Sequence, residues 1–283
     1  MQPDHLHLAR QIAKLFASLL QVEAVALGGS RSSGASDASS DIDLYIYTRA
    51  EIPLDARQAF VERSGSATET SLNMNYWGLC DEWVHALTSV EIDISYFEAH
   101  WMEDRLDWVI NRYQANLGYT TCFWYTIRQS IALRDPRGWF STLQNLCQSE
   151  YPEALRQNII ALNHPVLRSI IPSYSNQLDK AVKRRDLVSI NHRLAALFAS
   201  YFDILFALNR QLHPGEKRLV EMAVANCIKL PAKMEADITA ILQSASVELA
   251  SLSALVARLL DRLDRLLESE GFDLHRSRPL REA

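Results

Sequence analysis

The chain has 283 residues, of which 48% are apolar and 22% charged, and its formal net charge is −5. This length allows one large domain or two ordinary ones, while the acidic balance disfavours nucleic acid as the main partner. No run approaches the roughly 18 uninterrupted apolar residues of a membrane span, and the first residues lack the layout of a signal peptide. We therefore expect a cytoplasmic protein that does not insert into membranes.

Apolar periodicity divides the chain into a mixed first part and a helical remainder. The predicted elements are, in chain order, a helix over 8–19, strands over 22–27 and 41–48, a helix around 55–63, and strands near 68–76 and 89–97. After about residue 101, apolar residues recur at helical spacing almost to the end. We therefore predict an α+β protein, with a small mixed-sheet head over residues 1–100 and an all-helical bundle over residues 101–283.

A heptad-like stripe lies near the end of the chain. It consists of Leu252, Val256, Leu259, Leu263 and Leu266, spaced four, three, four and three residues apart. Such spacing is typical of helices that pack against other helices. We expect the stripe to pack inside the bundle, and a homodimer seam is the alternative.

Glycines and aspartates cluster between the first two strands, in the sequence LGGSRSSGASDASSDIDLYIY over 27–47. Strand alternation places Asp41 and Asp43 on one face, about 6.6 Å apart. Two such carboxylates repel unless a cation lies between them, and Mg²⁺ is a cation that takes oxygen ligands. A lone Asp-x-Asp pattern is more often a solvated strand face. The preceding turn, Gly28 to Ser30, changes this interpretation, because glycine N–H groups and a serine hydroxyl can hold a phosphate.

This stretch resembles the signature of the polymerase-beta-type nucleotidyltransferase superfamily, in which Gly-Gly-Ser or Gly-Ser is followed by Asp-x-Asp on a strand. The resemblance implies that Asp41 and Asp43 are catalytic ligands of Mg²⁺. It also implies a nucleotide site, for which we expect Gly28, Gly29, Ser30, Arg31 and Ser40 in the head and Lys217 in the helical part. For Lys217, a solvated surface position is an equal alternative.

The family uses a third carboxylate on a later strand, and the sequence VEIDISYF offers two candidates. Asp93 is bracketed by Ile92 and Ile94 in the way that Asp43 is bracketed by apolar residues. We therefore expect Asp93 to be the third metal ligand and the general base. Glu91 shares the same face one pleat away and is the alternative.

The resemblance implies two Mg²⁺ ions, ATP as the substrate, and transfer of AMP to an acceptor hydroxyl with release of pyrophosphate. Aminoglycoside and lincosamide nucleotidyltransferases have a similar layout, and the segments 118–140 and 201–219 resemble an uncharacterised helical domain found behind such heads. We expect a small-molecule acceptor. The alternatives are a protein or RNA acceptor, as in toxin–antitoxin nucleotidyltransferases, and a nucleotide-binding sensor without catalysis.

Asp203 stands out in the helical part, because it lies in the apolar run SYFDILFALN. A buried carboxylate without a partner is unfavourable. Asp203 is therefore expected either to contact a cationic acceptor or to pair with Arg193 or Arg210. We interpret the dispersed histidines, including His213, as structural.

Overall fold

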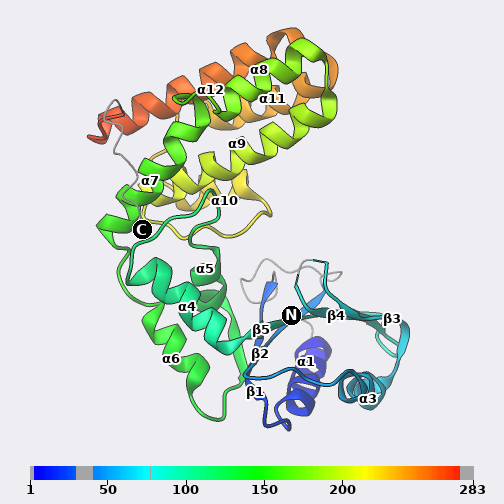
Figure 1. Ribbon diagram of the computed structural model, residues 1–283. Coiled ribbons are helices and arrows are strands. Elements are labelled where there is room, and N and C mark those ends of the chain that lie inside the picture. The colour runs from blue at the N-terminus through cyan, green and yellow to red at the C-terminus, as the bar shows by residue number, and fades with distance from the viewer. Residues whose placement is uncertain (1–2, 30–40, 77, 275–283) are drawn as a thin grey trace. The chain divides into compact units, whose positions relative to one another are not determined.

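The computed structural model describes residues 3–29, 41–76 and 78–274 (Figure 1). The chain forms two compact units. Unit 1 comprises residues 1–107 and 123–149, and unit 2 comprises residues 108–122 and 150–283. Unit 1 contains a mixed sheet with helices and unit 2 is helical, so the predicted α+β class is confirmed.

Unit 1 is built on a sheet that has six strands in the described residues, in the order β3-β4-β5-β2-β1-β6. The strands are β1 Val22–Leu27, β2 Ile42–Thr48, β3 Ala67–Met74, β4 Cys80–His85, β5 Glu91–Glu98 and β6 Ile131–Arg134. Strands β2 and β5 run parallel, and every other pair is antiparallel. The end of β1 and the starts of β2 and β5 therefore meet at one edge of the sheet.

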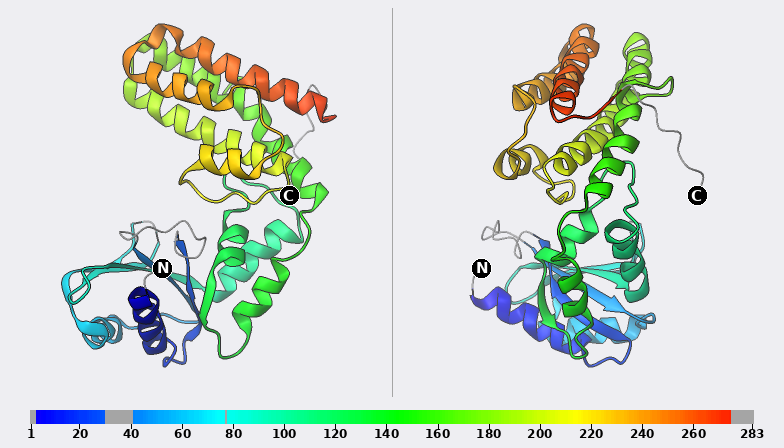
Figure 2. Two further views of the ribbon diagram at one scale, coloured as in Figure 1. Left: turned by 180° about the vertical axis from the view of Figure 1, so that it is seen from behind. Right: turned by 90° about the vertical axis from the view of Figure 1, so that its left-hand side faces the viewer.

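One face of this sheet is apolar and is covered by two helices, α1 Pro3–Phe16 and α3 Leu54–Gly65 (Figures 1 and 2). The alternating side chains of β2 and β5 supply this face, and they form one buried cluster with the apolar side of α1. The strand residues of the cluster include Ile42, Leu44, Ile46, Ile92 and Ile94. The residues between them, among them Asp43 and Asp93, consequently face the other way.

Aromatic side chains gather at one end of the opposite face. Three helices follow β5: α4 Ala99–Ile110, α5 Cys122–Gln129 and α6 Trp139–Leu146. The ring of Tyr47 packs on Phe140 of α6 at 5.3 Å between centroids, and Phe97 stacks on Trp101 of α4 at 6.2 Å. The carboxylates lie at the other end of the strands, so these rings do not cover them.

Two strands of unit 1 were not predicted from the sequence. Strand β4 lies in a stretch for which the sequence predicts no element. Strand β6 falls in the part expected to be helical, and it pairs with β1 through Ala26 and Ala132. Because of this pairing, and because Arg137 donates a hydrogen bond to a carboxylate oxygen of Glu23 in β1 at 2.9 Å, residues 123–149 pack with unit 1. The compact units therefore do not follow a single boundary at residue 100.

Unit 2 is a bundle in which α8, α9, α11 and α12 lie side by side (Figure 2). Its helices are α7 Glu153–Arg168, α8 Tyr174–Arg184, α9 Leu187–Leu208, α10 Leu219–Asn226, α11 Met234–Val247 and α12 Leu249–Ser269. Within the heptad-like stripe, Leu252, Val256, Leu259 and Leu263 are buried in the bundle core, which confirms the expected packing. No helix in the described ranges has the length and apolar composition needed to cross a bilayer.

Candidate active site

Three carboxylates lie side by side on three neighbouring strands. Asp43 of β2 is the register partner of Asp93 of β5, and Asp93 is in turn the partner of Glu82 on β4. Neighbouring strands are about 4.8 Å apart, so these side chains project from the same face in one short row. Asp41 and Glu91 precede the row by one pleat. Glu82 is not among the residues predicted from the sequence, because β4 is not predicted either.

The Gly28–Gly29 turn lies directly against this row. The Gly28 N–H donates a hydrogen bond to the Asp43 carbonyl at 2.9 Å. A Cβ atom at Gly29 would lie 1.8 Å from Oδ2 of Asp43, and one at Gly28 would lie 2.0 Å from the Tyr45 ring. Gly29 also has φ +61°, a conformation that side chains disfavour. Glycine is therefore required at both positions, because the chain turns back over the carboxylate without room for a side chain.

The negative charges of this face raise the pKa values of neighbouring side chains. Burial, followed by the charges of Asp43 and Glu82, raises the pKa of Asp93 to about 6. The neighbouring charge of Asp41 is the main cause that raises the pKa of Glu91. Burial and the charge of Asp43 raise the pKa of Tyr45 to about 12. The protein thus concentrates negative charge on this face, and that charge favours the protonated forms of Asp93 and Glu91.

On the opposite face of the same strand, Asp81 is a buried carboxylate with a structural role. Asp81, next to Glu82 in β4, points toward the helices and is 1% exposed. Arg57 donates to it at 2.7 Å, and the Tyr96 hydroxyl donates to its other oxygen at 2.7 Å. The described residues offer Glu82 and Glu91 no such cationic partner. Glu82 and Glu91 therefore leave negative charge on this face that an external cation could neutralise.

The donor chemistry of the row fits a hard divalent cation such as Mg²⁺, which prefers carboxylate oxygens. In the part of the chain that the structure describes, no group of three carboxylate, histidine or cysteine side chains is arranged to hold an ion as it stands. Magnesium commonly takes only one or two protein carboxylates and completes its shell with substrate phosphates and water. The fit to a metal therefore rests on Asp43 and Asp93 together with ligands from a substrate.

The remaining predicted residues occupy different places. Asp41 is exposed just before β2, and Glu91 is the exposed first residue of β5. Ser30, Arg31 and Ser40 lie outside the described residues. Lys217 is exposed in the turn before α10 of unit 2, and its role in nucleotide binding stays a prediction.

Asp203 has other partners than the arginines expected. It is buried in unit 2 and accepts hydrogen bonds from the Thr120 backbone N–H at 3.0 Å and from the Thr120 hydroxyl at 2.6 Å. Arg210 instead pairs with Glu153 at 2.8 Å. The prediction of an Asp203–arginine pair was therefore wrong, because a nearby loop supplies neutral donors that satisfy the carboxylate. Burial raises the pKa of Asp203 to about 7.

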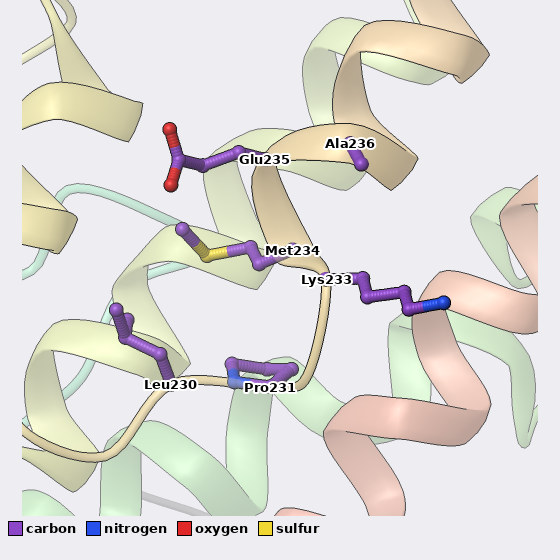
Figure 3. Close-up of a pocket in the computed structure, with 6 residues that line it drawn as sticks. All are labelled: Leu230, Pro231, Lys233, Met234, Glu235 and Ala236. Carbon is purple, nitrogen blue, oxygen red and sulfur yellow. The ribbon is translucent and has the colours of Figure 1, made fainter.

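A separate open pocket lies in unit 2, where the chain enters α11 (Figure 3). Its lining consists of Leu230, Pro231, Lys233, Met234, Glu235 and Ala236. The charged ends of Lys233 and Glu235 extend in different directions (Figure 3). None of the predicted site residues lines this pocket, so the candidate active site is the carboxylate face of unit 1.

Comparison with known proteins gives three findings. Residues 125–219 match the model of a family described as a domain of unknown function, DUF4037, which overlaps the segments that resemble an uncharacterised helical domain. No curated protein sequence matches the chain. A solved structure described as a nucleotidyltransferase-like protein from Exiguobacterium sibiricum 255-15 is similar with a TM-score of 0.44 and 11% identity, over 93% of this chain and 74% of that chain.

Proposed function

We propose that the protein is a Mg²⁺-dependent nucleotidyltransferase that transfers AMP from ATP to a hydroxyl group of a small acceptor molecule. The observation that carries the proposal is the register of Asp43 with Asp93 beneath the Gly28–Gly29 turn. A backbone turn suited to phosphate and a carboxylate pair suited to a metal lie in contact. Neither feature alone is specific, but their contact supports a site for a metal-bound triphosphate.

Each part of the face has a separate role in this proposal. Asp43 and Asp93, with Asp41 at the rim, would hold Mg²⁺, which would neutralise the triphosphate charge when bound. The N–H groups of the Gly28–Gly29 turn would donate to phosphate oxygens. Because the turn contacts Asp43, a triphosphate held by the turn would also lie next to the carboxylates.

The transfer itself exchanges a phosphoanhydride bond of ATP for a phosphoester bond to the acceptor. The acceptor oxygen forms a bond to the α-phosphorus of ATP, and the bond from that phosphorus to the bridging oxygen breaks, so that pyrophosphate leaves. The hydroxyl proton passes to a carboxylate oxygen of Asp93. In the metal-free protein, burial and the charges of Asp43 and Glu82 raise the pKa of Asp93 to about 6, which still leaves its carboxylate ionised near neutral pH.

The charge of the face favours a neutral or cationic acceptor. Glu82 and Glu91 flank the Asp43–Asp93 pair and add negative charge where an acceptor would approach. A polyanion such as RNA would be repelled by these side chains. The sequence also allowed a protein or RNA acceptor, or a sensor without catalysis. The experiment below distinguishes these alternatives from a small-molecule acceptor.

The test is incubation of the purified protein with Mg²⁺, ATP labelled at the α-phosphate, and a cell extract. Label that appears in small molecules and depends on both the protein and Mg²⁺ would support the proposal. Label in protein or RNA would support the proposed reaction but would show that the acceptor is a macromolecule and not a small molecule. Tight binding of ATP without transfer of label to any fraction would favour the sensor.

A further inference from the structure

The end of helix α5 carries an arginine, Arg128, and lies close to the Gly28–Gly29 turn. Helix α5 ends at Gln129, and strand β6 begins at Ile131. Ile131 is the register partner of Leu27, the last residue of β1 before the turn. The two strands are antiparallel, and paired Cα atoms lie about 4.5–5.5 Å apart. The chain just before Ile131, which includes Arg128, therefore lies near the turn that follows Leu27.

Hydrogen bonds fix the backbone on both sides of Arg128. The side-chain amide of Gln144 in α6 donates to the carbonyl oxygens of Ile127 and Ser130, at 3.0 Å and 2.8 Å. The Ser130 N–H also donates to the Thr126 carbonyl oxygen at 3.0 Å, which continues the helical turn past Arg128. Arg128 therefore projects from a segment whose position is well defined.

The Arg128 side chain is exposed, and among the residues that the structure describes its guanidinium forms neither a hydrogen bond nor an ion pair. Other arginines of unit 1 neutralise buried carboxylates, as Arg57 does with Asp81 at 2.7 Å. The guanidinium of Arg128 keeps its five N–H donors for water or for a ligand. Its planar arrangement of donors suits a phosphate group, to which it can donate two parallel hydrogen bonds.

The strand order indicates which part of the nucleotide would meet Arg128. Across the sheet, β5 carries Asp93, β2 carries Asp43, β1 leads into the Gly28–Gly29 turn, and β6 follows Arg128. In the proposed function the acceptor hydroxyl gives its proton to Asp93, so the α-phosphate is attacked from the β5 side. The attacking and leaving oxygens of such a transfer lie roughly in line. Pyrophosphate would therefore leave toward β1 and β6, the side on which Arg128 lies.

We propose that Arg128 binds the β- and γ-phosphates of the nucleotide and stabilises them as pyrophosphate leaves. This inference rests on the proposed function, because it requires a triphosphate at the Gly28–Gly29 turn. The carboxylates of the face repel that triphosphate, and Arg128 adds a positive charge on the side away from Asp93. Negative charge on the leaving group grows as its bond to the α-phosphorus breaks, so the guanidinium should lower the barrier as well as favour binding.

Arg128→Gln tests this contact, because it removes the charge and keeps a polar side chain at the end of α5. We expect the affinity for pyrophosphate in the presence of Mg²⁺, measured by calorimetry, to fall by roughly 10- to 100-fold, the equivalent of a hydrogen bond to a charged group. Arg134→Gln is the matched control. Arg134 is exposed at the other end of β6, opposite Val25, and within the described ranges its guanidinium also has no hydrogen bond or ion pair. This control removes the same charge, and its affinity should equal that of the wild type.

A lysine variant separates the phosphate contact from stabilisation of α5. A cation in the last turn of a helix interacts favourably with the C-terminal carbonyl groups, so Arg128 also favours the helix. Arg128→Lys keeps this charge but loses the paired donors. Its stability in urea should equal that of the wild type, whereas its affinity for pyrophosphate should lie between those of the wild type and Arg128→Gln.

A spectroscopic readout reports the contact in the unaltered protein. In the wild type labelled with ¹⁵N-arginine, the side-chain Nε–H signals of Arg128 and Arg134 are identified by their absence in the two glutamine variants. The Arg128 signal should move when pyrophosphate and Mg²⁺ are added, while the Arg134 signal should not.

The outcomes distinguish this inference from the function on which it rests. Wild-type affinity in folded Arg128→Gln, an equal loss in Arg134→Gln, or an unmoved Arg128 signal would overturn the role of Arg128 and leave the nucleotidyltransferase intact. If the wild type bound neither pyrophosphate nor ATP with Mg²⁺, the proposed function and this inference would both fall.

Discussion

Replacing Gly29 by alanine should abolish nucleotide binding while leaving the fold largely intact. The added Cβ would lie 1.8 Å from Oδ2 of Asp43, so the carboxylate or the turn must shift. The shift needed for ordinary contact is more than 1 Å, and a misplacement of about 1 Å can cost roughly 100-fold in rate. The left-handed backbone of Gly29 adds a cost of about 1–2 kcal/mol in unfolding free energy for any residue with a side chain.

Gly138→Ala separates the steric effect from the backbone strain. Gly138 also lies in unit 1 and has φ +71°, close to the +61° of Gly29, but nothing lies within 4 Å of its Cβ position. Backbone strain should therefore destabilise both variants by about 1–2 kcal/mol in urea unfolding, and the forced shift should destabilise Gly29→Ala further. Only Gly29→Ala should lose Mg²⁺-dependent ATP binding in calorimetry. Wild-type affinity in a folded Gly29→Ala protein would refute the claim that the turn and Asp43 form one site.

Three further predictions follow from the same geometry and from unit 2. ATP should bind weakly in the presence of a chelator and at least tenfold more tightly with Mg²⁺, since the ion neutralises the carboxylates; equal calorimetric affinities would exclude the metal role. Asp93→Asn should abolish AMP transfer whereas Glu91→Gln should lower its rate by about tenfold at most, and the reverse order would move the base along β5. The raised pKa of Asp203, about 7 against an ordinary 3.8, means that the folded state binds its proton more tightly, so stability should fall as the pH rises from about 4 to 7, by at most about 4 kcal/mol. Urea unfolding of the wild type and Asp203→Asn across this range should show that the variant loses this slope.

The sequence was most informative where side chains alternate strictly. In β2 and β5 the isoleucines and leucine point toward α1, and this periodicity predicted both strands and the common face of Asp43 and Asp93. The contact between the turn and Asp43 could be expected only from the resemblance to the nucleotidyltransferase signature, and not from the residues alone. It depends on β1 and β2 running antiparallel, and such a pairing is not visible in either strand alone.

The elements that the sequence did not reveal lack this periodicity for physical reasons. In β4 the inward positions are Asp81, Trp83 and His85, so polar side chains stand where apolar ones would mark a strand. A buried arginine on α3 makes Asp81 tolerable there, and that partner is 24 residues away in sequence. Strand β6 has only four residues, which are mostly exposed. It forms because it pairs with the free edge of β1. Glu82 and the true partners of Asp203 were missed for the same reason, since both depend on long-range contacts.

The most direct test of the central claim compares ATP labelled at the α-phosphate with ATP labelled at the γ-phosphate, in wild type and in Asp43→Asn. Asp43→Asn is nearly isosteric but removes one negative charge from the row of carboxylates. With Mg²⁺ and extract, we predict that wild type transfers the α-label to an acceptor and releases the γ-label as pyrophosphate, and that folded Asp43→Asn does neither. Transfer of the γ-label, or an Asp43→Asn variant as active as the wild type, would contradict the account.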